Sequence, residues 1–261
     1  MKEKLSIVIL TSYEGFFSKV FWEELILHLK LLDKIIIKHV FFLNFKNRTK
    51  LNYKVHQFFV LFSFGEILKL IFFELLNKIN NCFNLLNIFN VPFSIINKDD
   101  YHYIFKNIKR NAPIDLIISF NNPLILKNDI LSIPRISAVN IHNGKLPTYR
   151  GLYTPIWQIL NNEKEIVVTA HTMTPVIDIG RIIFEEILPI QDKSLLEIFL
   201  ELRKLDAFVV YKVLKEVRKD DFDLLNLKIL KNEGGKYYKT PTFKDLKKVK
   251  FILKSKNTEN E

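Results

Sequence analysis

The sequence predicts an α/β fold in which helices cover a β-sheet. Short apolar runs rich in β-branched and aromatic residues alternate with longer helix-like segments over the first half of the chain. Such alternation is typical of an α/β sheet. The 261 residues are 48% hydrophobic, which is enough to bury a substantial core in one large domain or in one domain with an extension.

The alternation defines the predicted elements of the first 142 residues. Strands are predicted at Leu5–Leu10, Ile35–Leu43, Val91–Ile96, Leu116–Phe120 and Ser137–Ile141. Helices are predicted at Phe16–Leu31, at Phe58–Phe89 in one or two pieces, and at Asp100–Arg110. The tripeptide Asn121–Pro123 ends the fourth strand. A loop therefore opens at that strand's carboxyl end, where ligands of open α/β sheets bind.

The second half of the chain predicts further strands and one long helix. "TPIWQIL" is a short predicted helix, and "IVVTAHTM" and "GRIIFEEILPI" are predicted strands joined by the loop "TPVIDI". An amphipathic pattern predicts a long helix over Ser194–Arg218. Beyond it, short apolar runs surround "GGKYYKTP", and we expect the polar tail to fray.

Charge and composition favour some classes of ligand and exclude others. The formal net charge of +11 favours an anionic ligand or surface. The densest basic run, Lys244–Lys254, alternates with apolar residues, as a solvated strand or helix face does, which argues against a dedicated nucleic-acid patch. The single cysteine, Cys82, excludes an internal disulfide and cysteine-based zinc motifs. The chain has seven glycines and no GxGxxG after the first strand, so neither dinucleotide binding nor a P-loop is supported.

The amino terminus and the most apolar stretch show whether the sequence predicts a signal peptide or a transmembrane segment. The basic start "MKEK" precedes a six-residue apolar run, which predicts a first strand instead of a signal peptide. The stretch Phe58–Leu76 is interrupted by Glu66, Lys69 and Glu74, so spanning a bilayer would be costly. We expect a cytoplasmic protein without a transmembrane segment. A membrane-surface scaffold that uses Phe58–Phe89 is an alternative, which burial of that segment against the sheet would dismiss.

Four polar residues form the candidate catalytic set. Asn140 and His142 are two apart near the end of a predicted strand, so they point to the same side. His171 and Asp178 come from the later strand and loop. An amide, an imidazole and a carboxylate together suit attack by an amine on a carbonyl, because two of them can stabilise an oxyanion while the third accepts a proton.

These residues stand in motifs that resemble the folate-dependent formyltransferase family. The likeness is carried by "NIHNGKLPTYRG", by "PIWQIL" and by "VTAHTMTPVIDIG". Asp178 follows Asn140 by 38 residues and His171 by seven, which is similar to the family's Asn-His-Asp pattern. The resemblance implies a formyltransferase-type Rossmann-like sheet with helices on both faces, a catalytic domain over residues 1–190, and a C-terminal helix with a short α+β extension over residues 191–261.

The resemblance also implies roles for single residues. With N10-formyltetrahydrofolate as formyl donor, Asn140 would polarise the formyl oxygen, His142 would act as acid or oxyanion partner, and Asp178 would accept the amine proton, with His171 in support. The segment "SFNNPLILKNDIL" is similar to the family's pterin-binding loop. Donor contacts are therefore implied for the backbone of Leu124 and Leu126 and for the loop Met173–Asp178, which includes Pro175.

The acceptor amine is inferred from departures within the family pattern. "TSYEGFF" after the first strand lacks the Gly- and Ser-rich loop of the purine branch, and the residues after the long helix are few for the barrel of the methionyl-tRNA branch. The pair Asn143-Gly144 after His142 resembles the amino-sugar branch, which implies a nucleotide-linked amino sugar and a place in O-antigen biosynthesis. The candidate acceptor contacts are Ser12, Tyr13, Asn143, Lys145, Tyr149 and Arg150.

Several alternatives remain open. "PTYRG" could simply form a turn, with Pro147 restricting φ and Gly151 in a conformation that other residues avoid. A methionyl-tRNA formyltransferase-like enzyme and a formyl-folate hydrolase use the same residues. A metallohydrolase would use His142, His171 and Asp178 as metal ligands, although their spacing is unlike that of common zinc motifs. The sequence also leaves a homodimer open.

Overall fold

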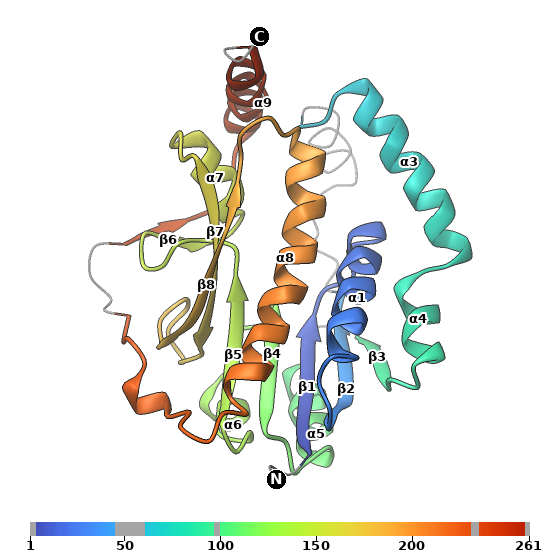
Figure 1. Cartoon of the computed structure of the whole chain (residues 1–261), viewed down its shortest axis with the longest axis vertical. Helices are drawn as coiled ribbons and strands as arrows, with labels where there is room; N and C mark the ends of the chain where they lie inside the picture. The colour runs from blue at the N-terminus through green and yellow to red at the C-terminus, as the bar shows by residue number, and fades with distance from the viewer. Residues whose placement is uncertain (1–3, 45–60, 97–99, 231–234, 259–261) are drawn as a thin grey trace.

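The computed structural model describes residues 4–44, 61–96, 100–230 and 235–258. These residues form a mixed sheet with the strand order β3-β2-β1-β4-β5-β7-β8 (Figure 1). Strands β1 to β5 run parallel to one another, whereas β7 is antiparallel to both β5 and β8. The strands are β1 (Leu5–Thr11), β2 (Ile35–Leu43), β3 (Phe93–Ile96), β4 (Leu116–Phe120), β5 (Ser137–His142), β7 (Glu165–Thr172) and β8 (Ile182–Pro189). The predicted α/β fold is confirmed.

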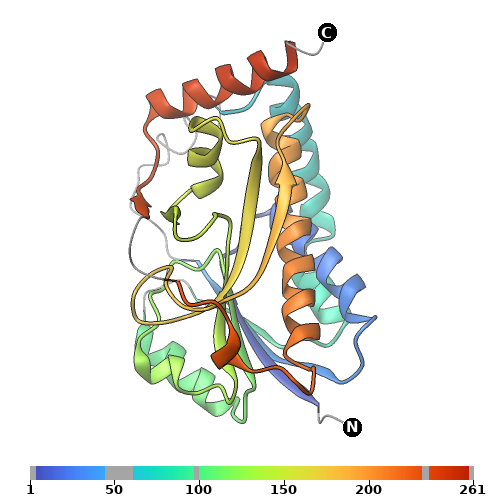
Figure 2. The ribbon, with the colours of Figure 1, turned by 60° about the vertical axis from the view of Figure 1, so that its left-hand side comes forward.

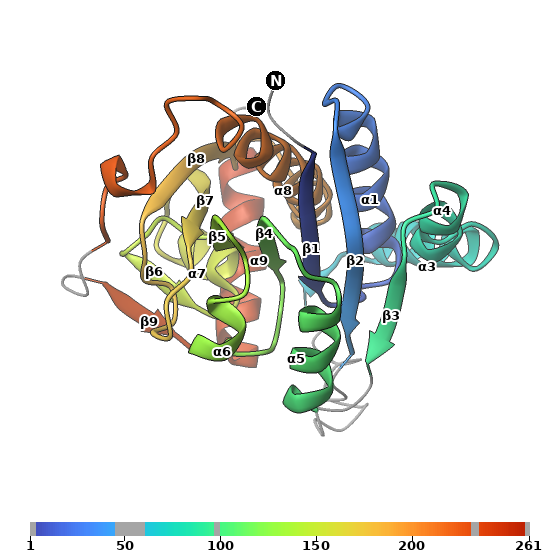
Figure 3. The same ribbon diagram turned by 90° about the horizontal axis from the view of Figure 1, so that it is seen from below.

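Helices cover both faces of the sheet, as Figure 3 shows from below. All residues of β1 are buried, because its side chains alternate between two apolar clusters. Ile7 and Ile9 pack on the side of α1 (Phe16–Leu29) and α8 (Leu195–Glu216). Val8 and Leu10 pack on the side of α5 (Tyr101–Arg110) and α6 (Asn128–Leu131).

The predicted helical segment Phe58–Phe89 forms two helices within the described residues, and residues 58–60 lie outside them. Helix α3 (Phe64–Ile79) begins with a capping box in which Ser63 and Glu66 satisfy each other's backbone N–H groups. Helix α4 (Cys82–Ile88) begins where the Asn81 side chain accepts hydrogen bonds from two backbone N–H groups. The helix α3 lies at the outside of the molecule, beyond α1 (Figure 1).

The predicted long helix corresponds to α8, which packs chiefly against α1 and β8. Its start is set by a second capping box, formed by Ser194 and Glu197. Residues of α8 share one apolar cluster with residues of β1 and α1. The division of the chain near residue 190 stays a prediction.

A small second sheet joins two distant parts of the chain. Strand β6 (Tyr149–Gly151), within the stretch that the sequence suggested as a turn, pairs in parallel with β9 (Lys236–Tyr238). Between β8 and β9 lie α8 and a short 3₁₀ helix, η1 (Leu224–Asn226). Helix α9 (Phe243–Thr258) then crosses α7 (Thr154–Leu160), as Figure 2 shows. The basic run Lys244–Lys254 is therefore a helix, whose apolar side packs on α7 and whose lysines are mostly exposed.

The helices within the described ranges include none with the length and apolar character needed to cross a membrane.

Candidate active site

The candidate site lies at the end of β5, where the neighbouring strand β7 runs in the opposite direction. Asn140 and His171 are direct cross-strand partners, and the Asn140 amide nitrogen lies 3.3 Å from His171 Nε2. His142 follows two positions later on β5, and its ring centroid is 6.5 Å from that of His171. The antiparallel pairing therefore brings together the three residues that the sequence singled out on these two strands.

The hydrogen bonds of His171 define its tautomer. Its Nδ1 lies 2.9 Å from the backbone carbonyl oxygen of Thr172, which can only accept, so Nδ1 carries the proton. Its Nε2 is then an acceptor for the Asn140 amide N–H. Burial, followed by the proximity of His142, lowers the pKa of His171 from 6.5 to about 4. His171 is therefore neutral at neutral pH and orients the Asn140 amide.

Asp178 completes the set from the loop between β7 and β8. Its backbone has the positive φ of 53°, an uncommon conformation for a residue other than glycine. One carboxylate oxygen accepts a hydrogen bond of 2.7 Å from the Gly151 N–H, and the other lies 3.6 Å from His142 Nδ1. Both side chains are only 7% exposed. The carboxylate is thus held against the imidazole in a largely dry environment.

His142 is fixed by the chain that immediately follows it. Its Nε2 donates to the backbone carbonyl of Tyr149 at 2.7 Å, so a neutral ring leaves Nδ1 unprotonated and facing Asp178. A Cβ atom at Gly144 would stand 2.6 Å from that same carbonyl oxygen and 2.7 Å from His142 Nε2. The glycine after Asn143 is therefore required by the close return of the chain over the imidazole.

The Asn143 side chain points to α8. Its amide oxygen accepts a hydrogen bond of 2.9 Å from Arg203, and its amide nitrogen donates at 2.5 Å to Asp206. Arg203 and Asp206 form a buried ion pair of 3.1 Å, with Glu14 3.5 Å from the guanidinium. Burial raises the pKa of Asp206, while Arg203 and Asn143 lower it. This network anchors the residue after His142 to α8.

Arg203 and Asp206 were not singled out from the sequence. The sequence does contain a pattern that could have indicated them, because an arginine and an aspartate three residues apart interrupt the buried side of an otherwise apolar helix. Such a pair is ordinarily a surface ion pair, and only the tertiary structure shows that the turn after β5 covers it.

The remaining candidate acceptor residues lie in different settings. Lys145 is exposed, whereas Tyr149 is buried with its ring stacked on Tyr238 and its hydroxyl donating to Glu163. Arg150 donates to the Gly235 carbonyl at 3.4 Å. Tyr149 therefore contributes its backbone carbonyl to the site and its side chain to the small sheet.

Ser12 and Tyr13 follow β1 and contact its neighbours. The Ser12 hydroxyl donates to the Leu43 carbonyl at 3.3 Å. The Tyr13 hydroxyl accepts a hydrogen bond from Asn77 on α3, and its ring lies 4.9 Å from that of Phe83. The position after β1 thus connects the carboxyl edge of the sheet to α3.

The residues implied in donor binding lie in the segments that follow β4 and β7. The Leu124 N–H donates to the Asn122 side chain, and the Met173 N–H donates to the Ala138 carbonyl. Leu126 is buried in the cluster against which Leu124 and Met173 pack, whereas Pro175 is exposed. Their contacts to a donor remain predictions.

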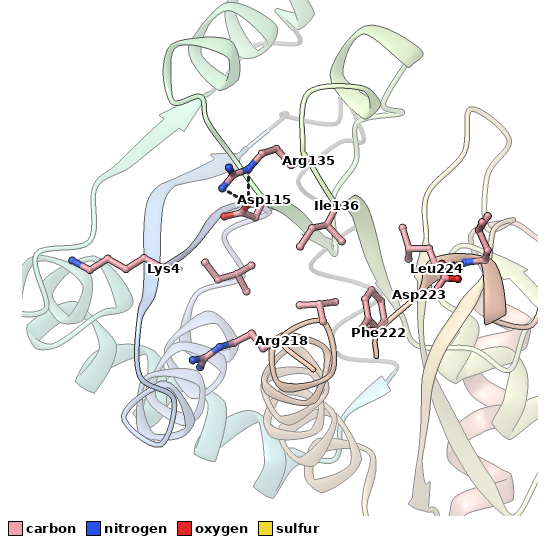
Figure 4. A pocket seen from close by; sticks show the side chains of 11 residues that line it. Lys4, Asp115, Arg135, Ile136, Arg218, Phe222, Asp223 and Leu224 are labelled. Carbon is pink, nitrogen blue, oxygen red and sulfur yellow. Dashed lines mark hydrogen bonds and ion pairs between the residues drawn. The ribbon is translucent and has the colours of Figure 1, made fainter. Parts of the chain in front are cut away.

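A cavity lies elsewhere, at the edge of the sheet where the parallel strands begin. It has a volume of about 610 Å³ and is bordered by the starts of β1, β4 and β5 and by the end of α8 (Figure 4). Arg135 on its rim pairs with the buried Asp115 at 2.6 Å. The candidate catalytic residues are at the carboxyl ends of the strands, so this cavity is separate from them. Among the described residues, no three His, Cys, Asp or Glu side chains are grouped to hold a metal ion.

The sheet order and covering helices define an α/β protein with the formyltransferase fold. A phosphoribosylglycinamide formyltransferase from Anaplasma phagocytophilum superposes with a TM-score of 0.62 at 15% identity, over 89% of this chain and 96% of that chain. A sugar N-formyltransferase from Shewanella sp. FDAARGOS_354 has a TM-score of 0.53 at 17% identity, over 90% and 76%.

Residues 100–206 match the formyl transferase family. An 80-residue stretch is 41% identical to the bifunctional polymyxin resistance protein ArnA of Wigglesworthia glossinidia brevipalpis, covering 31% of this chain and 12% of ArnA. A methionyl-tRNA formyltransferase of the same organism is 30% identical over 143 residues, which is 54% of this chain and 44% of that protein. The chain spans less than half the length of these curated relatives.

Proposed function

We propose that the protein transfers a formyl group from N10-formyltetrahydrofolate to an amine carried by a nucleotide-linked sugar. One observation carries the transfer step: Asn140 and His142 of β5 converge with Asp178, which is distant in sequence, at the carboxyl edge of the sheet. The family to which residues 100–206 belong uses N10-formyltetrahydrofolate as its formyl donor. We include in the proposal that this chain uses the same donor and that these three residues are catalytic.

The convergent groups have complementary tasks in the reaction. The amine nitrogen attacks the formyl carbon, and the electron pair of the C=O bond moves to the oxygen. An Asn140 N–H donates to that oxygen, and a protonated His142 adds positive charge beside it. The Asp178 carboxylate accepts the amine proton, directly or through a water. The electron pair on the oxygen then re-forms the C=O bond as the bond from the carbon to N10 breaks, and the proton held by Asp178 passes to N10 of the departing tetrahydrofolate.

The preference for a sugar amine rests on the turn after His142. Gly144 lets the chain fold back over the imidazole, and Lys145 in that turn is exposed beside the site. A cationic side chain there suits the diphosphate of a nucleotide-linked sugar. The second candidate is methionyl-tRNA, because relatives that carry this activity in their name match up to 54% of the chain.

Mass spectrometry of candidate acceptors tests the proposal directly. The protein is incubated with N10-formyltetrahydrofolate and, separately, with nucleotide-linked 3- and 4-amino-deoxyhexoses, glycinamide ribonucleotide and methionyl-tRNA. We expect a formyl mass increment on an amino sugar, and none with an Asn140→Ala variant. Formylation of methionyl-tRNA alone would select the second candidate. Release of tetrahydrofolate at a rate that no amine raises would show a hydrolase instead.

A further inference from the structure

Helix α3 exposes a continuous row of large apolar side chains. We call this row the outer face of α3, and its members are between 43 and 80% exposed. They are Phe64, Leu68, Ile71, Phe72, Leu75, Leu76 and Ile79. Scattered apolar residues are normal at protein surfaces, but a contiguous apolar patch marks an interaction site.

The spacing of these residues places them on one side of the helix. Steps of three and four residues connect the row from Phe64 to Ile79, as on one face of a helix with 3.6 residues per turn. The buried residues of α3, Ile67, Leu70 and Asn77, occupy the opposite side. The helix is therefore apolar on the side that it turns away from the protein as well as on its buried side.

Polar contacts hold the inner side of α3 in place. Near the end of the helix, Glu74 accepts a hydrogen bond of 2.7 Å from the Phe16 N–H of α1, and Asn77 donates to the Tyr13 hydroxyl at 3.1 Å. Near its start, Glu66 accepts a hydrogen bond of 3.1 Å from the N–H of Leu196 on α8. Rotating the outer face inward would break all three contacts, so its exposure belongs to the folded state.

The charges of α3 are segregated in the same way. Both acidic residues, Glu66 and Glu74, are engaged on the inner side. The exposed lysines Lys69 and Lys78 lie at the two borders of the outer face. Hydrogen bonds from Ser194 and, to a smaller extent, the charge of Lys69 lower the pKa of Glu197 at the start of α8, so Lys69 lies near that carboxylate. Phenylalanine and leucine between flanking lysines are typical of a helix that lies in the interface of an anionic bilayer.

We propose that the outer face of α3 binds the surface of an anionic phospholipid membrane, with the helix axis in the plane of the membrane. The apolar row would enter the acyl boundary, and the lysines would extend to the lipid phosphates. A second copy of the chain is less complementary, because two outer faces in contact would bring lysines toward lysines between molecules that each carry a formal net charge of +11.

Vesicle flotation of the full chain tests this interface. Vesicles of phosphatidylcholine alone are compared with vesicles of phosphatidylcholine and phosphatidylglycerol, at low and high salt. We expect flotation with the anionic vesicles that weakens as salt is raised. The double variant Phe72→Ser/Leu75→Ser is expected to lower the partition coefficient by about 100-fold, because two large apolar side chains no longer leave water.

Two further variants separate the contributions. Leu225→Ser/Phe251→Ser removes apolar side chains of η1 and α9 that are more exposed than Phe72 and Leu75, at 75 and 74%, and we expect this variant to float like the wild type. Lys69→Gln/Lys78→Gln is expected to lose up to about 30-fold in binding to anionic vesicles. Far-ultraviolet circular dichroism confirms that each variant is folded.

Three results would overturn the proposal. The first is a folded wild type that floats with neither kind of vesicle, and the second is unchanged flotation of Phe72→Ser/Leu75→Ser. The third is a wild-type dimer, seen by sedimentation velocity, that this variant converts to a monomer while neither protein floats. None of these readouts depends on formyl transfer, so the interface stands or falls separately from the proposed function.

Discussion

The polar residues of the candidate site constrain one another through backbone groups. The Thr172 carbonyl sets the tautomer of His171, the Tyr149 carbonyl holds Nε2 of His142, and the Gly151 N–H holds Asp178. Each of these backbone groups leaves one side-chain atom directed at a neighbouring site residue. The resulting chemistry depends on the main chain around the site as much as on the side chains themselves.

For Asp178 we expect the substitution Asp178→Asn to lower kcat about 10²- to 10⁴-fold with little change in KM for the donor, because the amide cannot accept the amine proton. An amide oxygen can still accept the Gly151 N–H, so the loop conformation is retained. Asp192→Asn is the matched control, since Asp192 also has a positive φ and is exposed. Full activity of Asp178→Asn in steady-state kinetics would refute the assigned role.

For His171 we expect a contribution to acid lability. Its pKa of about 4 in the folded protein lies below the ordinary 6.5, so between these pH values the unfolded chain binds a proton that the folded one excludes. Stability is therefore lost as the pH falls from 6.5 to 4, by about 3 kcal/mol. Urea unfolding across this range should show a smaller loss in His171→Gln. The exposed His102→Gln should behave like the wild type.

At the scale of elements, the site depends on contacts that join α8 and the small second sheet to the end of β5. Asn143 is held by Arg203 and Asp206 of α8, and Gly151 belongs to β6, which pairs with β9. These elements contribute no candidate catalytic side chain. They hold the turn after His142 in the position in which the chain folds back over the imidazole.

For the buried ion pair we expect Arg203→Met to lower the free energy of unfolding by about 3 kcal/mol or more, because Asp206 would remain buried beside no cation. The double variant Arg203→Met/Asp206→Leu should recover most of that loss, since both charges are removed. Lys19→Met, which breaks the surface pair Lys19–Glu23 of 3.6 Å, should cost less than about 1 kcal/mol. Urea denaturation measures the free energy of unfolding of all three variants. An equal decrease in Arg203→Met and in the double variant would contradict the idea that the unpaired Asp206 charge causes the loss.

For β6 we expect Gly151→Ala to destabilise the protein by about 1 to 3 kcal/mol. The φ of Gly151 is 97°, and an added Cβ would stand 2.3 Å from the Tyr238 carbonyl oxygen in β9. Gly65→Ala is a contrasting control, because a Cβ there meets nothing within 4 Å and alanine favours the helix. Thermal unfolding measurements should show a lower Tm for Gly151→Ala and no decrease for Gly65→Ala.

At the scale of the whole molecule, local patterns predicted most of the fold. Apolar runs predicted the strands Ile35–Leu43 and Leu116–Phe120 with their observed bounds. The second of these strands is buried throughout, as its continuous apolar run indicates. The strand Tyr149–Gly151 could not be recognised, since three residues carry no periodicity and its partner, β9, is distant in the chain.

The sequence predicted which residues form the candidate site better than it predicted the contacts that hold them together. The spacing of Asn140 and His142 predicted a common side of one strand, and the structure places them there. That Asn140 would face His171 depends on the register of two strands, which no local pattern determines. The roles of all these residues remain predictions that the proposed kinetics address.

The pairing of Asn140 with His171 has a consequence for the order of events in folding. Side chains alternate between the faces of a strand, so a slip of β7 by one residue would place His171 on the face of the sheet opposite to that of Asn140. Strands β7 and β8 join the parallel strands only through the pairing of β7 with β5. A chain in which that pairing had not formed, or had formed in another register, would lack the catalytic constellation, so activity during refolding would return only with the correct pairing of β5 and β7.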